Sequence, residues 1–320
     1  MVEVGIPIYK ARETLPAALD SLVAQTKKMF LVCLSIDGDG EDYTDIIDTY
    51  KARGLNIRVI KNEHHGPGAA RQHVIDTTQC EYLMFLDADD MLMPNAVKNL
   101  SDAIRYSNCD ILKSAFVREQ THKKDDIIPQ DIFTITWMHG KIYRTDYLRN
   151  NNIRFLNLDT EEDANFNLVA WNSTDNRGEI TDITYLWRDN KNSLTRHLSQ
   201  ADYFARTYVN YVYGQVKGLN YIYKLTNQIH HKLVTQTLIN LYTYYMEAKF
   251  RKLDLDKLDE IISTLKDKLW MVGYLNNGEN WIDLVNSMKV GAFYDNEFVI
   301  FYQEPINKWI TRLLRKEENG

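Results

Sequence analysis

An apolar run that ends in three carboxylates constrains this chain more than any other feature of its sequence. Residues 81–86 have the length and composition of a buried strand, and Asp87, Asp89 and Asp90 follow directly. Open α/β sheets bind their ligands at the carboxyl ends of the strands. Neighbouring carboxylates repel one another unless a cation lies among them, and their oxygens suit a hard divalent ion. The junction therefore predicts a site for a metal ion that carries a polyphosphate.

Strand-like and helix-like patterns alternate over the first two hundred residues. The first four strand-like runs cover residues 2–8, 30–36, 57–60 and 81–86. Amphipathic, helix-like segments separate them, which gives the order βαβαβαβ. That order is typical of a mostly parallel sheet wrapped by helices. We predict an α/β domain over residues 1–198.

Long helical patterns replace this alternation after about residue 200. The clearest cover residues 201–217, 227–252, 255–271 and 305–316. We predict an all-helical C-terminal domain over residues 199–320, with an acceptor-side or interaction role. Residues 201–252 combine nine tyrosines with seven Lys and Arg and only two Asp and Glu. This composition suits a sugar polymer or a nucleic acid, and equally suits helix packing with buried tyrosine rings.

Composition and charge describe an ordinary soluble protein. The net charge is -6, with 26% charged residues. No leader-like segment opens the chain and no apolar stretch is long enough for a membrane span, so we expect a cytoplasmic protein without a transmembrane segment. Its oligomeric state stays open. The three cysteines lack metal-ligand spacing and lie beside apolar runs, which indicates buried free thiols.

The separated motifs, taken in order, resemble the family 2 glycosyltransferases of the GT-A fold. The resemblance covers about residues 2–197. It rests on Gly5 to Tyr9, Asp37-Gly38, Asn62 with Gly66 to Arg71, Phe85 to Asp90, Glu162 to Phe166, Trp187-Arg188 and Ser193 to Thr195. It implies inverting transfer of a sugar from a nucleotide-diphosphate sugar to an acceptor hydroxyl, with UDP-sugar as the expected donor and Mn²⁺ or Mg²⁺ as the cofactor.

The resemblance also implies a set of donor-binding residues. These are Pro7, Tyr9, Asp37, Gly68, Arg71, Asp87 and Arg188. Asp37 would contact the nucleotide base, although a glycine separates it from Asp39 where the family usually has adjacent acids, and a tight polar turn is the alternative. Arg71 would face the diphosphate or the sugar, and a solvated arginine at a loop-helix junction is its alternative.

The metal ligands implied by the resemblance are Asp89, Asp87 and His197. Asp90 is an alternative to Asp89, and Asp87 would lie nearer the ribose or a metal-bound water. The competing interpretation places an acid at the N-terminus of the following helix, which would account for one carboxylate only.

The catalytic residues implied by the resemblance are Asp163, as the base that accepts the acceptor proton, and Glu162, which would orient the acceptor. Acids in the first turn of a helix also favour the helix dipole, which is the structural alternative. His139 either binds substrate or is a polar loop residue.

The acceptor and two other functional classes stay open at this stage. The acceptor is a surface glycan, a protein, or modified (hydroxymethylated) DNA of bacteriophage type, and the negative net charge disfavours DNA. A nucleotidyltransferase of related fold would use the same acids and release pyrophosphate. A non-catalytic module that binds glycans or nucleic acids would bind without turnover.

Overall fold

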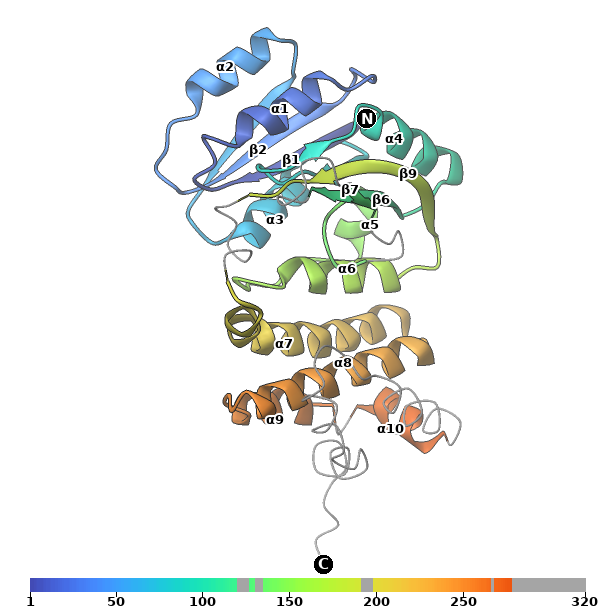
Figure 1. Cartoon of the computed structure of the whole chain (residues 1–320). Coiled ribbons are helices and arrows are strands. Elements are labelled where there is room, and N and C mark those ends of the chain that lie inside the picture. Colours follow the sequence, from blue (N-terminus) through green and yellow to red (C-terminus); the bar gives the residue numbers. More distant parts are fainter. Residues whose placement is uncertain (120–126, 130–134, 191–197, 266–267, 278–320) are drawn as a thin grey trace, which may run out of the picture. The chain divides into compact units, whose positions relative to one another are not determined.

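The computed structural model describes residues 1–119, 127–129, 135–190, 198–265 and 268–277. Clustering of contacts divides the chain into two compact units, Met1–His197 (unit 1) and Leu198–Gly320 (unit 2), which Figure 1 shows coloured along the sequence. Each unit has its own apolar core, so each is described by itself.

One half of the unit 1 sheet is parallel. Its strands lie in the order β3 (Ile57–Asn62), β2 (Leu31–Asp37), β1 (Val2–Ile8) and β4 (Tyr82–Phe85). The crossovers contain helices α1 (Leu15–Val23), α2 (Thr44–Ala52) and α3 (Pro67–Thr77). All four residues of β4 are buried, as expected for a central parallel strand that is covered on both faces.

The other half of the sheet contains both antiparallel and parallel pairs. Strand β8 (Lys141–Arg144) pairs antiparallel with β4 and with β6 (Ile111–Glu119), and β6 pairs parallel with β9 (Arg177–Trp187). The short strands β5 (Met91–Leu92) and β7 (Ile127–Pro129) pair antiparallel with β9 and β6. The helices of this half are α4 (Ala96–Ser107), α5 (Thr145–Asn150) and α6 (Glu162–Asn172).

Parallel pairing brings three chemically important chain segments to one edge of the sheet. Tyr9 directly follows β1, and Asp37 is the last residue of β2. Asp87 comes two residues after the end of β4, with Leu86 between them. Because β1 lies between β2 and β4, these residues come from adjacent strand ends. Gly5 in β1 permits tight packing, since an added Cβ would lie 2.9 Å from Val74 of α3. The predicted α/β fold class is confirmed.

Unit 2 is helical in its described part. Its helices are α7 (Gln200–Thr226), α8 (His231–Phe250), α9 (Asp256–Ser263) and α10 (Leu269–Asn276). Ser199 caps α7 by accepting a hydrogen bond from the Asp202 backbone N–H at 3.1 Å. Asn227 ends the same helix in the left-handed conformation, at φ 56°. The chain then starts α8 four residues later.

The single helix expected over residues 255–271 is wrong, because α9 ends at Ser263 and α10 begins at Leu269. Leu265 and Met271 both lie in the unit 2 core, and the interruption lets both side chains reach it. The helix expected over residues 305–316 lies outside the described residues. Four tyrosines in the described part of unit 2 are core residues, namely Tyr208, Tyr242, Tyr245 and Tyr274.

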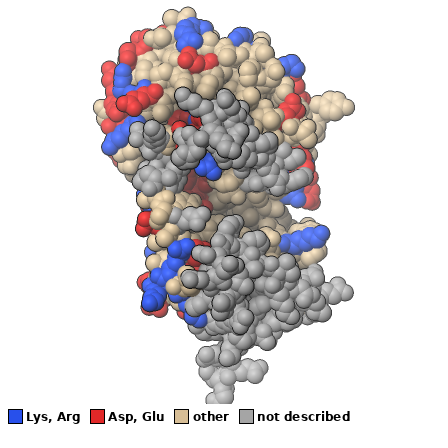
Figure 2. All heavy atoms as spheres, viewed as in Figure 1, with Lys and Arg blue, Asp and Glu red and all other residues tan. Residues whose placement is uncertain are grey.

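Two further sequence expectations concern the whole chain. Cys33, Cys80 and Cys109 are buried free thiols, as predicted. Among the described helices, none combines the length and the apolar composition that a bilayer span requires. Acidic and basic side chains are interspersed over the described surface of unit 1 on the face drawn in Figure 2.

Candidate active site

The carboxyl end of β4 forms a compact group of possible metal ligands. Asp87, Asp90 and His139 place one ligand atom each within 4.8 Å of one another. Asp90 is 2% exposed. Its Oδ2 accepts a hydrogen bond from the Tyr185 hydroxyl at 2.7 Å, and its Oδ1 accepts one from the Arg188 backbone N–H at 2.8 Å. Two carboxylates and an imidazole form a donor set that suits Mn²⁺, and the carboxylates suit Mg²⁺.

The two acids of this group have opposite electrostatic environments. Burial raises the pKa of Asp90 well above its usual range, and the neighbouring carboxylates of Asp89 and Asp87 raise it further. Burial also acts to raise the pKa of Asp87, but the charges of Arg71 and His139 outweigh it and lower that pKa. A divalent cation would relieve the repulsion that acts on Asp90, so the residues fit such an ion.

Aromatic rings surround His139. Its ring stacks on Tyr185 with centroids 4.5 Å apart, and it packs against Phe116 and Trp187, each at 5.1 Å. Its Nε2 lies 3.7 Å from Asp90 Oδ2 and 4.0 Å from Asp87 Oδ2. The packing fixes the orientation of the imidazole toward the two acids. His139 is therefore part of the acidic group and not a solvated loop histidine.

The other metal-site residues expected from the sequence lie differently. Asp89 accepts a hydrogen bond from the Asn190 side-chain amide at 2.9 Å and is not in the compact group. Arg188 contributes its backbone N–H to Asp90, while its side-chain Nε is 3.8 Å from Glu119. His197 lies outside the described residues.

Arg71 links the metal-site acids to the acids of helix α6. Its guanidinium donates to Asp87 at 2.6 Å and to Glu162 at 2.9 Å, and these residues lie 16 and 91 positions away in the sequence. Arg71 is 5% exposed, so the alternative of a solvated arginine is wrong. Burial acts to lower its pKa, but the two carboxylates raise it above the usual range. Its Nε is buried and has no hydrogen-bond partner among the described residues.

Asp163 occupies the first turn of α6, beside Glu162. Its Oδ1 accepts a hydrogen bond from the Ala164 N–H at 2.7 Å. Burial, followed by the negative charge of Glu162, raises the pKa of Asp163 well above its usual range. A carboxylate with a raised pKa is a stronger proton acceptor once it is ionised. Glu161, which precedes α6, adopts a left-handed backbone with φ 64°.

A buried lysine lies near this acidic end of α6. Lys141 is 2% exposed and donates from Nζ to the backbone carbonyl of Trp137. The pKa of Lys141 is lowered to about 7, mainly by burial; the charge of Asp163 acts in the opposite direction, and Lys113 adds to the lowering.

The residues expected on the nucleotide side form a second group, at the ends of β1, β2 and β3. The Asp37 carboxylate accepts hydrogen bonds from the backbone N–H groups of His65 and Gly66, both at 2.9 Å, and lies 2.8 Å from His64 Nδ1. His64 stacks on Tyr9 with ring centroids 4.3 Å apart and an interplanar angle of 18°. Asp37 thus fixes the loop between β3 and α3. Its role therefore extends beyond the tight polar turn that was the alternative interpretation.

Two further predicted donor residues have clear positions. Pro7 lies in β1 beside Ser35 of β2 and is only partly buried. Gly68 lies in the first turn of α3, where an added Cβ would approach the Glu162 side chain to 3.0 Å. Its lack of a side chain therefore lets α3 pack against the acidic start of α6.

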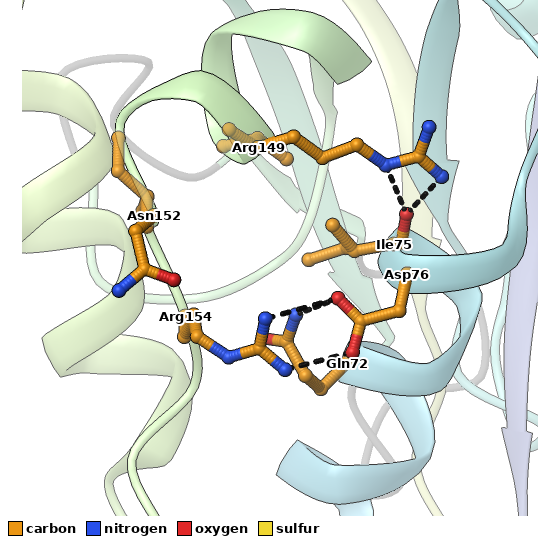
Figure 3. Close-up of a pocket in the computed structure, with 8 residues that line it drawn as sticks. Gln72, Ile75, Asp76, Arg149, Asn152 and Arg154 are labelled. Carbon is orange, nitrogen blue, oxygen red and sulfur yellow. Dashed lines mark hydrogen bonds and ion pairs between the residues drawn. The ribbon is translucent and has the colours of Figure 1, made fainter.

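A separate pocket lies between α3 and α5, and Figure 3 shows its lining. Arg149 donates to the carbonyl of Ile75 at 2.9 Å, and Arg154 forms an ion pair with Asp76 at 2.7 Å. A cation that binds carbonyls near the end of a helix stabilises that end. The polar groups of this pocket thus tie α3 to the segment after α5.

Sequence reasoning did not identify Tyr185, Asn190, Lys141 or His64 as site residues. Tyr185 is 1% exposed and lies in an alternating strand, so its sequence context is that of a core residue. Its hydroxyl donates to Asp90, 95 positions away, and accepts from the Asp87 backbone N–H at 3.2 Å, and these contacts link it to the acids. His64 follows a strand at the sheet edge, and this position was the one sequence signal that could have indicated it.

The family model described as Glycosyl transferase family 2 matches residues 3–160. This chain contains a glycosyltransferase family 2 domain. The match includes β4 with its acids, and the family predicted from the sequence is confirmed. Among curated family 2 relatives, an uncharacterized glycosyltransferase, EpsJ of Bacillus subtilis, is 24% identical over 216 residues, which cover 61% of this chain and 63% of that protein. The chain spans less than two thirds of the length of such relatives.

Solved structures support the GT-A fold for this family 2 member. Residues 1–349 of Staphylococcus aureus TarS, in complex with UDP-GlcNAc, give a TM-score of 0.56 at 19% identity, covering 92% of this chain and 93% of that one. A mannosyltransferase from Pyrobaculum calidifontis, in complex with GDP-Man and Mn²⁺, gives 0.55 at 10% identity, covering 98% and 86%. At these identities the similarity shows the fold alone.

Proposed function

We propose that this chain transfers a sugar, with inversion, from a nucleotide-diphosphate sugar to an acceptor hydroxyl, and that the donor is a UDP-sugar. The observation that carries the proposal is the chain of ionic contacts Asp87–Arg71–Glu162. It joins the acids after β4 to the acids that open α6, in a family 2 domain. A donor-side group and an acceptor-side group are thereby held in one continuous arrangement.

Different donor-side residues bind different parts of the nucleotide. Pro7, Tyr9 and Asp37 serve the base and ribose at the ends of β1 and β2, while Gly68 and Arg71 lie at the start of α3. Arg188 adds positive charge beside the acids. These roles follow from the family resemblance together with the positions of the residues at one edge of the sheet.

A divalent ion, Mn²⁺ or Mg²⁺, would be held by Asp87 and Asp89, with Asp90 and His139 as further donors in the same region, and His197 stays a proposed ligand. When bound, such an ion stabilises the negative charge of the departing diphosphate. The raised pKa of Asp90 supports the proposal, because the carboxylates of Asp89 and Asp87 repel its charge and a cation among them would remove that repulsion.

Asp163 acts as the catalytic base. It takes the proton from the acceptor hydroxyl as that oxygen forms a bond to the anomeric carbon and the bond to the nucleoside diphosphate breaks. Glu162 orients the acceptor, and its ion pair with Arg71 holds it in place at 2.9 Å. Burial of Arg71 keeps this pair out of water, which strengthens it and fixes its geometry.

The acceptor is a hydroxyl of a surface glycan, a protein or modified DNA, and unit 2 takes part in binding it. On α7, Lys217 Nζ lies 5.3 Å from the ring centre of Tyr213, and Lys224 Nζ lies 5.7 Å from that of Tyr221. Tyrosine and lysine side chains in this arrangement offer stacking and charged contacts to a polymer. A panel of oligosaccharides and a labelled duplex, assayed in parallel for transfer and binding, discriminates the acceptor classes.

The decisive experiment is a screen of nucleotide sugars for slow donor hydrolysis with Mn²⁺, with Mg²⁺ and with EDTA. We expect release of a nucleoside diphosphate that depends on the divalent ion. Release of pyrophosphate would instead indicate a nucleotidyltransferase. Binding of glycan or nucleic acid without any turnover would indicate a non-catalytic module.

A further inference from the structure

We propose that His64 selects the donor nucleobase, acting as a hydrogen-bond acceptor through Nε2. The inference rests on the proposed function, because it assumes that a nucleotide binds at the ends of β1, β2 and β3. The occupant is a nucleotide whose base presents a ring N–H, which is the case for uracil and guanine.

The hydrogen bonds of Nδ1 determine which ring nitrogen carries the proton. His64 Nδ1 lies 2.8 Å from Asp37 Oδ2 and 3.1 Å from the Asp37 backbone oxygen. A carboxylate oxygen and a carbonyl oxygen both accept and do not donate, so Nδ1 must carry the hydrogen. In the neutral imidazole, Nε2 is then the acceptor. Asp37 therefore acts on the base through His64, since its own side chain is only 3% exposed.

The surrounding backbone holds His64 in this orientation. Asp37 also accepts from the N–H groups of His65 and Gly66, which fixes the two residues that follow His64. Gly38 has φ +61°, and an added Cβ there would lie 2.6 Å from the His64 backbone N. The two loops are thus in contact at a point that tolerates no side chain, and a preorganised acceptor results.

Exposure and stacking place His64 where a base can reach it. Its side chain is 52% exposed, although Nδ1 faces buried Asp37. Its ring stacks on Tyr9, whose own exposure is 43%. A half-exposed aromatic pair at the edge of the sheet that binds nucleotides offers both a flat surface and one directed acceptor.

The test is the affinity of the full-length protein for UDP, CDP, GDP and ADP, measured by calorimetry with Mn²⁺ at pH 8. UDP and CDP form one pair of equal size, and GDP and ADP form another. Within each pair, the first base has a ring N–H where the second has a ring nitrogen that accepts. For the size class that binds, we expect wild type to prefer the N–H base by about tenfold, because the other base would place a second acceptor against Nε2.

The variant His64→Phe keeps an aromatic ring on Tyr9 and removes Nε2. We expect this variant to bring the ratio of the two affinities within the pair close to one. The control is His65→Phe, at the neighbouring exposed residue, and it should keep the wild-type ratio of affinities. His64→Leu removes the ring as well, and thermal melting of each variant checks that the fold is intact. A ratio that His64→Phe leaves unchanged, or a wild type without preference, overturns the role of His64. Failure of wild type to bind any of the four nucleotides instead overturns the proposed function.

Discussion

The two units of this chain differ in which polar side chains they bury. Unit 1 buries charged residues, among them Glu3, Asp37, Arg71, Asp90, Lys113, Lys141 and Glu162. Among the described residues of unit 2, the buried polar side chains are Thr207, Gln215 and Thr237, all uncharged. A buried charge lowers stability unless it is paired, so a fold retains such charges at a cost. In unit 1, these buried charges include the acids and the arginine of the candidate active site.

The largest expected effect is on catalysis. Replacing Asp163 with Asn removes the proposed base and should lower the transfer rate by roughly 10²- to 10⁴-fold. Asp146→Asn, an exposed acid on α5, is the matched control and should leave the rate unchanged. Initial rates with a saturating donor measure both. If Asp163→Asn transfers sugar at the wild-type rate, the base is another group.

A second test compares a buried with an exposed ion pair. Arg71→Leu leaves Asp87 and Glu162 without their shared partner, and we expect it to destabilise unit 1 by about 3–5 kcal/mol. Arg154→Leu breaks an ion pair with Asp76 in which both side chains are exposed to solvent, and its expected cost is about 0–1 kcal/mol. Chemical denaturation measures both values. Equal costs would mean that burial of Arg71 does not strengthen its contacts.

A third test addresses the core of unit 2. Leu238 is fully buried there, and Leu238→Ala should destabilise this unit by about 2–5 kcal/mol through the cavity it leaves. Because the units have separate cores, calorimetry should show this change in a different transition from the one that Arg71→Leu lowers. A single transition that both variants lower equally would show that the two units unfold together.

The smallest expected effect is on the pH dependence of activity. A base must be ionised to accept a proton, and the pKa of Asp163 is raised. Activity should therefore be present above this raised pKa and fall about tenfold per unit as the pH decreases through it. Profiles of kcat/KM against pH test this, with Asp146→Asn as the control that keeps the acid limb. If kcat/KM instead falls at about pH 4, where an ordinary aspartate titrates, the pKa of Asp163 is not raised.

Local patterns predicted the first four strands and the edge of the sheet that they form, but not the short strands β5, β7 and β8. The run before Asp87 is apolar because β4 is covered on both faces, and this requirement is visible in the sequence alone. The extent of β9 is less predictable, because the apolar strand pattern of the sequence covers only residues 183–187, whereas β9 begins at Arg177. Its first residues are largely exposed and lack the apolar signal on which such a prediction depends.

The partners of the site residues could not be predicted from the sequence. Arg71 was expected to face the donor, yet its guanidinium also binds Glu162, 91 positions away. Asp37 was expected to meet a base, and its carboxylate instead fixes the loop that carries His64. Such pairings depend on which helix packs against which strand end, and no local pattern encodes that choice.

By itself, the sequence determined the fold class, the family and the position of the acids at a strand end. Each of these follows from short-range order along the chain, since strand and helix periodicities and motif spacings are local properties. Three-dimensional packing is what brings Asp90 and His139 to Asp87, lets Tyr185 donate to Asp90, and places Arg71 between two acids. Those contacts join residues far apart in the chain, and they arise from packing in three dimensions.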